Sequence, residues 1–324
     1  MRQSRNSTAQ ASCLGRFFAP CLQNERIKQD SLHTLPTALG EGMIAIRYFQ
    51  PDPVLRSHVS SYYWFESRLP AFADLMRAEL GQIRLVVAGE AMNDYGGGHV
   101  REGRAAILQG PTSAPVHYRA NARLALFGIG LLPRGWAELV GVPAAELADD
   151  AVDLAGVWPA GGVARLLDAV ANAGSDAARC AVVDRALGQR LALGRDAHAW
   201  FTRLADDWLT GSTNPAVDAL VAASGMSARS VERLCQRIYG ASPKLLARKY
   251  RALGAAVRLA TGEAADWVDA AGDAFYDQAH FIREFRAFTG LTPARFQIEA
   301  APVTRLTIAR RRQLPGLPRL ALIA

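Results

Sequence analysis

Apolar residues recur at helical spacing in two similar segments of the last third of the chain. The first segment follows Gly225 and closes at Gly240, with Ser242–Pro243 shortly after. The second closes in the same way, at Gly290 with Thr292–Pro293. Repetition of apolar spacing and of the closing residues predicts two copies of one supersecondary unit.

The first copy predicts two helices joined by a tight turn. Asn214 followed by Pro215 is typical of a helix start, and Gly225 can take the left-handed conformation that the turn needs. Ser227 can then cap the second helix. The residues expected to face inward are Val231, Leu234, Cys235 and Ile238. The residues expected to face outward are Arg229, Ser230, Glu232, Arg233, Gln236 and Arg237. This arginine-rich face, with Ser227 at its start, suits the major groove of DNA.

The second copy predicts a similar helix with a more aromatic inner face. Asp277 is the expected N-cap, and the inner residues are Phe281, Phe285 and Phe288. The outward residues, expected to contact DNA, are Gln278, His280 and Arg283. An ordinary pair of helical hairpins with solvated faces is the alternative, and the match in caps, core and exit favours two helix-turn-helix units instead.

The stretch from about Trp200 to Phe296 resembles the DNA-binding domain of AraC/XylS-type transcriptional regulators. The family signature GF-x-D-Q-x-x-F-x-R-x-F, followed by G-x-T-P, is similar to residues 274–293. The resemblance implies that residues 243–261 form one long helix that joins the two units. Ala274 stands where the family usually has glycine. If that position needs a positive φ, alanine should cost about 1 kcal/mol.

Basic residues concentrate around the first unit and the connecting helix. Between residues 229 and 258 there are eight basic residues and one acidic residue, Glu232. We therefore expect phosphate contacts there, with Arg248 and Lys249 as the connecting-helix contacts. An acidic segment, residues 263–277, precedes the second recognition helix and carries no base. The first unit should supply more of the electrostatic affinity.

The first half of the chain alternates short apolar runs with Gly and Pro breaks, which predicts a small antiparallel sandwich or barrel. The expected strand segments are 44–49, 59–65, 83–87, 105–108, 116–118 and 124–129. Residues 44–190 resemble the cupin-like sensory domain of some AraC-type regulators, notably in Pro53-x-Leu55, Tyr62-Tyr63-Trp64, Gly110-Pro111, Phe127-Gly128-Ile129 and Pro133-x-Gly135. The compact His and Glu ligand set of cupin enzymes is missing around His58, His99 and His117, so we expect a sensor or dimerisation module without metal.

Two other features of this half call for interpretation. The aromatic run Tyr62–Phe65 could line a ligand pocket, but alternation along a strand lets only half of it share one surface, and ordinary core packing is favoured. The glycines 96–98 lack the Lys-Ser/Thr of a phosphate loop, and they indicate a hairpin tip.

The expected fold class is α+β, with a β-rich domain followed by an all-α domain. The predicted divisions are a disordered or mis-started tail (1–42), a sensory or dimerisation domain ending in helices over 161–193 (43–193), a double helix-turn-helix domain (194–298) and a basic tail (299–324). Residues 194–196 are the expected hinge. The terminal helices of the first domain should pack on the barrel or on a second subunit. The basic tail either attracts phosphate or is solvated and disordered.

Composition adds limits to this picture. The chain has 324 residues, 50% of them apolar, and a net charge of +7. No apolar run approaches the roughly 20 residues that span a bilayer. The cysteines, Cys13, Cys21, Cys180 and Cys235, form no C-x-x-C pair, which indicates free thiols in a reducing cytoplasm.

We expect a sequence-specific transcriptional regulator that responds to an effector through its N-terminal domain and has no enzymatic activity, cofactor or metal. Two other classes stay open: a DNA-binding architectural protein without effector, and a cupin-type enzyme with a DNA-binding appendage. Double-stranded DNA is the expected partner. RNA polymerase, a small-molecule effector and a second copy of the chain are left open as partners, and no membrane contact is expected.

Overall fold

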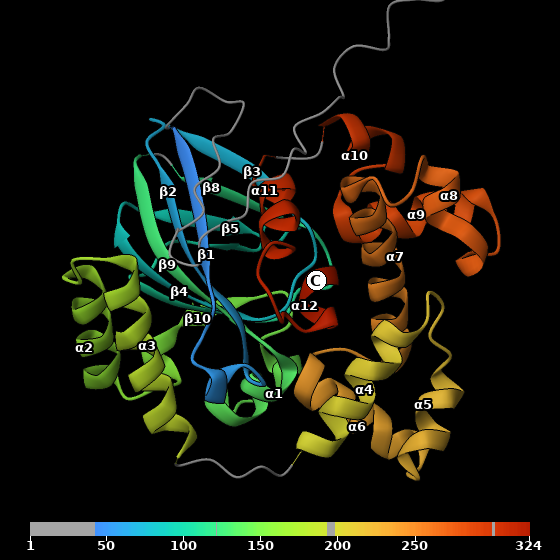
Figure 1. Cartoon of the computed structure of the whole chain (residues 1–324), viewed down its shortest axis with the longest axis horizontal. Coiled ribbons are helices and arrows are strands. Elements are labelled where there is room, and N and C mark those ends of the chain that lie inside the picture. Colours follow the sequence, from blue (N-terminus) through green and yellow to red (C-terminus); the bar gives the residue numbers. More distant parts are fainter. Residues whose placement is uncertain (1–42, 121, 193–197, 300–301) are drawn as a thin grey trace, which may run out of the picture. The chain divides into compact units, whose positions relative to one another are not determined.

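Two antiparallel sheets form the N-terminal half of the protein (Figure 1). The computed structural model describes residues 43–120, 122–192, 198–299 and 302–324. The larger sheet has the strand order β1-β2-β9-β4-β7-β10, and the smaller sheet has the order β3-β8-β5-β6. The strands are β1 (Ile44–Phe49), β2 (Val59–Ser67), β3 (Phe72–Met76), β4 (Gln82–Ala88), β5 (Ala91–Asp94), β6 (Val100–Arg101), β7 (Ala106–Gln109), β8 (Val116–Ala120), β9 (Leu124–Leu131) and β10 (Ala151–Asp153).

These sheets confirm the predicted β-rich domain, and each of its six expected strand segments overlaps a strand. The expected tail at 1–42 and the expected hinge at 194–196 lie outside the described residues. The glycines 96–98 form the tip of the β5–β6 hairpin, and all three have positive φ. The hairpin prediction for this run is therefore confirmed.

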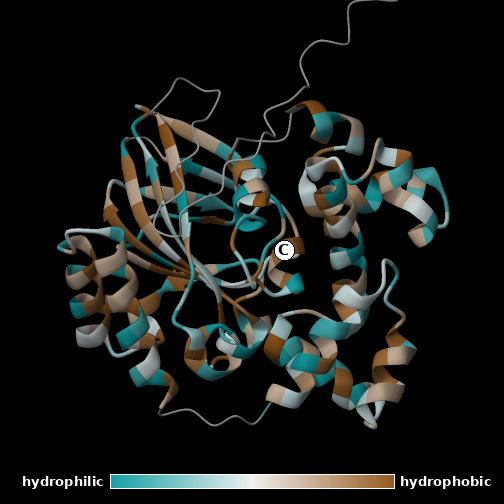
Figure 2. Ribbon diagram, viewed as in Figure 1, coloured by the Kyte–Doolittle hydropathy of each residue, from teal (hydrophilic) through white to brown (hydrophobic). Residues whose placement is uncertain are grey.

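Strand β2 builds two hydrophobic cores by alternation. Tyr62 and Trp64 join one core cluster, whereas Tyr63 and Phe65 join another that residues of both sheets share. Successive residues of a strand point to opposite faces of a sheet. Figure 2 shows how apolar residues concentrate along these strands. The aromatic run divides as predicted, and one half of it faces the space between the sheets.

Helices α2 (Ala160–Ala171) and α3 (Asp176–Leu191) pack on the barrel. Their buried residues, which include Val170 and Leu187, belong to the same cluster as Trp64. Of the two packing partners left open for these helices, the barrel is the one found. The connections also contain short helical turns: η1 (Pro53–Leu55), α1 (Pro133–Gly135), η2 (Trp136–Val140), η3 (Ala144–Glu146) and η4 (Leu154–Gly156).

Two groups of helices flank one long helix in the C-terminal half (Figure 1). Helix α7 (Pro243–Thr261) has the predicted bounds, begins at the Ser242 cap and contacts both groups. The remaining helices are α4 (Ala199–Gly211), α5 (Val217–Ser224), α6 (Ala228–Tyr239), α8 (Trp267–Ala271), η5 (Gly272–Ala274), α9 (Gln278–Thr289) and α10 (Pro293–Glu299). Within the described residues, no helix is long and apolar enough to cross a membrane.

The start of α5 differs from the prediction. The helix begins at Val217 with Ala216 as its N-cap, and Asn214 is not the cap. The Asn214 side-chain oxygen instead accepts a hydrogen bond of 2.8 Å from Arg251 of α7. Its hydrogen-bond donor is therefore the guanidinium of a distant helix, and not the main-chain amides at the start of α5.

The expected strain at Ala274 is also absent. Within the described chain, Asp149 is the one non-glycine residue with positive φ, so Ala274 has an ordinary backbone. Gly272, two residues earlier, has φ +49°. The second turn has its positive φ at this glycine, so the condition for a cost at Ala274 is not met.

The basic tail is folded, which corrects the expectation of a solvated segment. It forms α11 (Pro302–Arg311) and α12 (Arg319–Ile323), and Ile308 and Leu320 are buried. Helix α11 contacts β1, β3 and α7, and α12 contacts α4 and α7. Arg311 is itself buried, so it is not available to attract phosphate. Apolar residues between the arginines give this segment a side that packs on the core. Its basic composition alone indicated a solvated segment.

Candidate nucleic-acid interface

Helix α6 presents the exposed basic face that its sequence predicts. The Ser227 hydroxyl oxygen accepts a hydrogen bond of 3.3 Å from the Ser230 amide, which confirms the predicted cap. Val231, Cys235 and Ile238 are buried, while Leu234 is half-buried. Burial raises the pKa of the Cys235 thiol to about 12, so this cysteine is an inert core residue.

The outward side chains of α6 have no competing ion pairs. Arg229, Glu232, Arg233 and Arg237 are exposed, and Ser230 is partly so. In the part of the chain that the structure describes, none of the three arginines has a carboxylate partner. An arginine without an internal partner keeps its donors free for phosphate or for a guanine edge.

Helix α9 repeats this arrangement with fewer charges. The Asp277 carboxylate accepts a hydrogen bond of 2.6 Å from the His280 amide, so the predicted cap is confirmed. Phe281, Phe285 and Phe288 are buried. Gln278 and Arg283 are exposed, whereas His280 is partly buried with Nε2 3.6 Å from Glu284. Of the three predicted contact residues on α9, only Arg283 is a permanent cation.

Glu284 fixes α9 to the connecting helix, a role that the sequence reasoning missed. Its carboxylate accepts from Arg248 Nε at 2.5 Å and from Arg251 Nη2 at 2.8 Å. Burial favours a higher pKa for Glu284, but the hydrogen bonds from the two arginines outweigh it and lower the pKa. The signal in the sequence was an acid one helical turn after His280, on a chain whose connecting helix is basic.

The comparisons agree with this geometry. Residues 220–298 match a family described as a helix-turn-helix domain, and residues 47–153 match a domain of unknown function, DUF6597. Residues 220–298 form an AraC-type helix-turn-helix DNA-binding domain. The chain is accordingly a DNA-binding transcription regulator. No curated protein matches the chain.

Solved structures give a weaker likeness. ToxT from Vibrio cholerae is 10% identical and covers 73% of this chain and 97% of its own, with a TM-score of 0.43. ToxT from Vibrio cholerae O395 is 9% identical, covers 71% and 98%, and has a TM-score of 0.40. An RmlC-like cupin protein from Ralstonia eutropha is 12% identical, covers 34% and 69%, and has a TM-score of 0.23. At these values the likeness carries no argument about function.

Lys249 does not reach the DNA-facing side of the AraC-type domain. Its side chain is buried, and Nζ donates to the main-chain oxygens of Glu79 and Thr112, both at 2.7 Å. Burial lowers the pKa of Lys249 to about 7. The expected phosphate contact is wrong for this conformation because the barrel covers the amine. For Arg248, whose side chain is 43% exposed beside Glu284, the phosphate contact stays a prediction.

Both recognition helices of the AraC-type domain end against the barrel. Gly240 after α6 and Gly290 after α9 have φ +78° and +81°, the left-handed region that ends many helices. A Cβ at Gly240 would fall on the Pro111 side chain, and one at Gly290 would fall on Leu75. Glycine is required at these positions both for conformation and for close approach.

A basic groove lies between the two units of the AraC-type domain. Its lining includes Lys244, Arg248, Arg251 and Arg283, against one acid, Glu284. Two of these arginines already share that acid. The groove therefore retains a positive balance between the two recognition helices, as a phosphate-binding surface requires.

We expect the first unit to contribute more DNA affinity than the second. Alanine at Arg229, Ser230 and Arg233 together should weaken operator binding at least about tenfold more than alanine at Gln278, His280 and Arg283, because two exposed cations are lost against one. Binding of both triple variants to the natural operator at one salt concentration measures the difference. An equal or larger loss from the second triplet would contradict the ranking.

Proposed function

We propose that the protein is a sequence-specific, effector-responsive regulator in which α6 reads base edges and the barrel senses a small molecule. The observation that carries the DNA-reading role is the face of α6: a capped helix whose inner residues are buried and whose arginines have no acidic partner in the described part of the chain. Helix α7 and Glu284 hold the second recognition helix in a fixed orientation, which supports reading two successive grooves.

Arg233 is the residue that we propose for base reading. It lies on the face of α6 opposite the buried Val231 and Cys235. Replacing Arg233 with alanine should cost about 1 to 3 kcal/mol on the operator and little on random DNA. Genome-wide footprinting with the purified protein would supply the operator, and titrations on both DNAs would measure the loss.

Arg203→Ala provides a matched control, since Arg203 is an exposed arginine on α4, outside the recognition helices. It should leave both affinities unchanged. Equal losses on operator and random DNA from Arg233→Ala would mean that Arg233 contacts phosphate and reads no base.

The proposal extends to location and partners. Such a regulator acts on cytoplasmic DNA, so RNA polymerase and a second copy of the chain are the partners that we propose beside the effector. The position of the footprint relative to promoters tests the contact with RNA polymerase. The mass of the DNA-free protein in solution tests the association with a second copy. A DNA-binding protein whose affinity no small molecule changes would fit the architectural alternative instead.

A further inference from the structure

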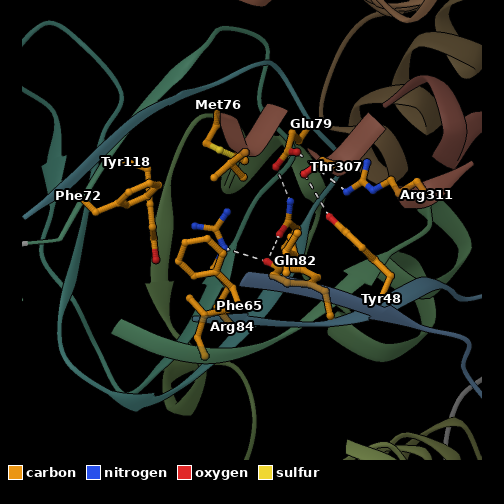
Figure 3. A pocket seen from close by; sticks show the side chains of 14 residues that line it. Tyr48, Phe65, Phe72, Met76, Glu79, Gln82, Arg84, Tyr118, Thr307 and Arg311 are labelled. Carbon is orange, nitrogen blue, oxygen red and sulfur yellow. Dashed lines mark hydrogen bonds and ion pairs between the residues drawn. The ribbon is translucent and has the colours of Figure 1, made fainter. Parts of the chain in front are cut away.

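A small cavity lies in the barrel between the two sheets (Figure 3). Its volume is about 40 Å³, and α11 supplies part of its wall through Val303, Thr307 and Arg311. One side is apolar and includes Phe65, Phe72 and Met76. The space holds a few water molecules at most. A larger occupant therefore needs part of the cavity wall to move.

Arg84 lines this cavity without an anionic partner. Its side chain is 4% exposed, and its nitrogens bond only neutral oxygens, Tyr63 Oη at 3.3 Å and Asn93 Oδ1 at 3.4 Å. Its guanidinium lies 5.0 Å from the Tyr118 ring centre. Among the described residues it forms no ion pair. A buried cation with two long bonds to neutral groups is poorly compensated for the water it has lost.

The nearby acid does not supply the missing charge. Glu79 also lines the cavity, but its carboxylate accepts a hydrogen bond from Gln82 Nε2 and lies 4.0 Å from Arg311 Nη2. The cavity therefore contains two arginines and one carboxylate. One positive charge stays unbalanced among the groups that line it.

Tyr118 provides a second unused donor. The side chain is 6% exposed and lines the same cavity, and its hydroxyl has no hydrogen-bond partner within the described part of the chain. Buried hydroxyls nearly always have a partner. A guanidinium and a hydroxyl that both lack acceptors, beside an apolar wall, form the complement of a carboxylate attached to an apolar body.

We propose that this cavity binds a small organic carboxylate, with its carboxylate on Arg84 and Tyr118 and its apolar body against Phe65, Phe72 and Met76. The inference rests on the proposed sensory function for its biological meaning, although the binding itself can be measured without DNA. The body makes room for itself by displacing part of the cavity wall.

Residues 77–79 connect the cavity to the DNA-binding half. Glu79 lines the cavity and its main-chain oxygen accepts from Lys249, while the Ala78 amide donates to the Phe288 oxygen at 2.8 Å. Arg77 donates to the main-chain oxygens of Ile323 and Ala324. A ligand that moves Glu79 or α11 therefore acts on contacts of α7, α9 and α12.

The test compares a charged probe with its neutral analogue on the full chain. Acetate, butyrate and benzoate should be titrated against thermal unfolding, with benzamide as the neutral match for benzoate. At least one carboxylate should raise Tm, because a ligand that binds only the folded state stabilises it. Benzamide should not. Equal shifts from benzoate and benzamide, or no shift from any carboxylate, would overturn the proposal.

Tyr118→Phe is the decisive variant. Because the hydroxyl has no partner among the residues that the structure describes, its removal should leave the ligand-free Tm unchanged or slightly higher, but it should weaken carboxylate binding roughly tenfold. Tyr95→Phe is the matched control, since the buried Tyr95 hydroxyl also lacks a partner within the described ranges and Tyr95 does not line the cavity. It should change neither quantity. Unchanged carboxylate affinity in Tyr118→Phe would show that the hydroxyl does not bind the ligand.

Arg84→Gln should abolish the preference for benzoate over benzamide. If this variant fails to fold, the Tyr118 and Tyr95 pair still decides. The two proposals fail separately: operator binding without any carboxylate effect leaves the regulator and removes this ligand class. Carboxylate binding without operator binding would keep this ligand class and remove the proposed regulator function.

Discussion

Replacing Lys249 with alanine is expected to lower the free energy of unfolding of the full chain by about 2 to 6 kcal/mol. The change leaves the main-chain oxygens of Glu79 and Thr112 without their donor, and each unpaired buried polar group costs about 1 to 3 kcal/mol. Denaturant unfolding monitored by circular dichroism measures the loss.

Lys244→Ala is the control for this prediction, because Lys244 lies in the first turn of the same helix and is exposed. It should change stability by no more than about 0.5 kcal/mol. A Lys249→Ala loss as small as that of the control would mean that the barrel and α7 separate readily in solution. It would also return Lys249 to the set of residues that can reach phosphate.

Replacing Asp206 with asparagine is expected to stabilise the protein at pH 8 and to have little effect at pH 4. Burial raises the pKa of Asp206 to about 7 from 3.8. Between these values the folded chain holds a proton that the unfolded chain has released, so stability falls as the pH rises through this range. One pKa unit corresponds to about 1.4 kcal/mol, which sets an upper limit of about 4 kcal/mol at pH 8.

The hydrogen bonds around Asp206 agree with this direction. The Tyr239 hydroxyl lies 2.7 Å from Asp206 Oδ1 and 3.1 Å from the Thr202 main-chain oxygen, but it has one hydrogen to donate. A protonated Asp206 can donate to Tyr239, which then donates to Thr202. Asparagine can donate in the same way at every pH.

The measurement is the free energy of unfolding from pH 4 to pH 8 for the wild type, Asp206→Asn and the exposed neighbour Asp207→Asn. Only the Asp206 variant should lose the downward slope. Parallel curves for wild type and Asp206→Asn would mean that the carboxyl is ionised throughout this range in the folded protein.

Local features of the sequence predicted the DNA-binding half well. Ser227 and Asp277 cap α6 and α9 because the amides that they accept from lie within three residues. Phe281 and Phe285 are buried because helical spacing places them on one face. These are short-range effects, and sequence spacing alone specifies them.

Errors occurred where a distant part of the chain decides the environment. Lys249 and Arg311 lie in basic segments that are typical of solvated surface, but the barrel covers both side chains. Asn214 lost its expected role to an arginine 37 residues away. Strands β3 and β5 escaped prediction for another reason: they contain aspartate or asparagine and only brief apolar alternation, so pairing with β8 stabilises what propensity does not.

The contacts of Gly240 and Gly290 with the barrel have a mechanical consequence. The two recognition helices are joined twice, once by α7 and once through Pro111 and Leu75 on the barrel. The two recognition helices, α7 and the barrel are therefore connected in a ring, and none of them can rotate without moving another. If one helix tilts to follow a bent groove, the barrel or the other helix has to move with it.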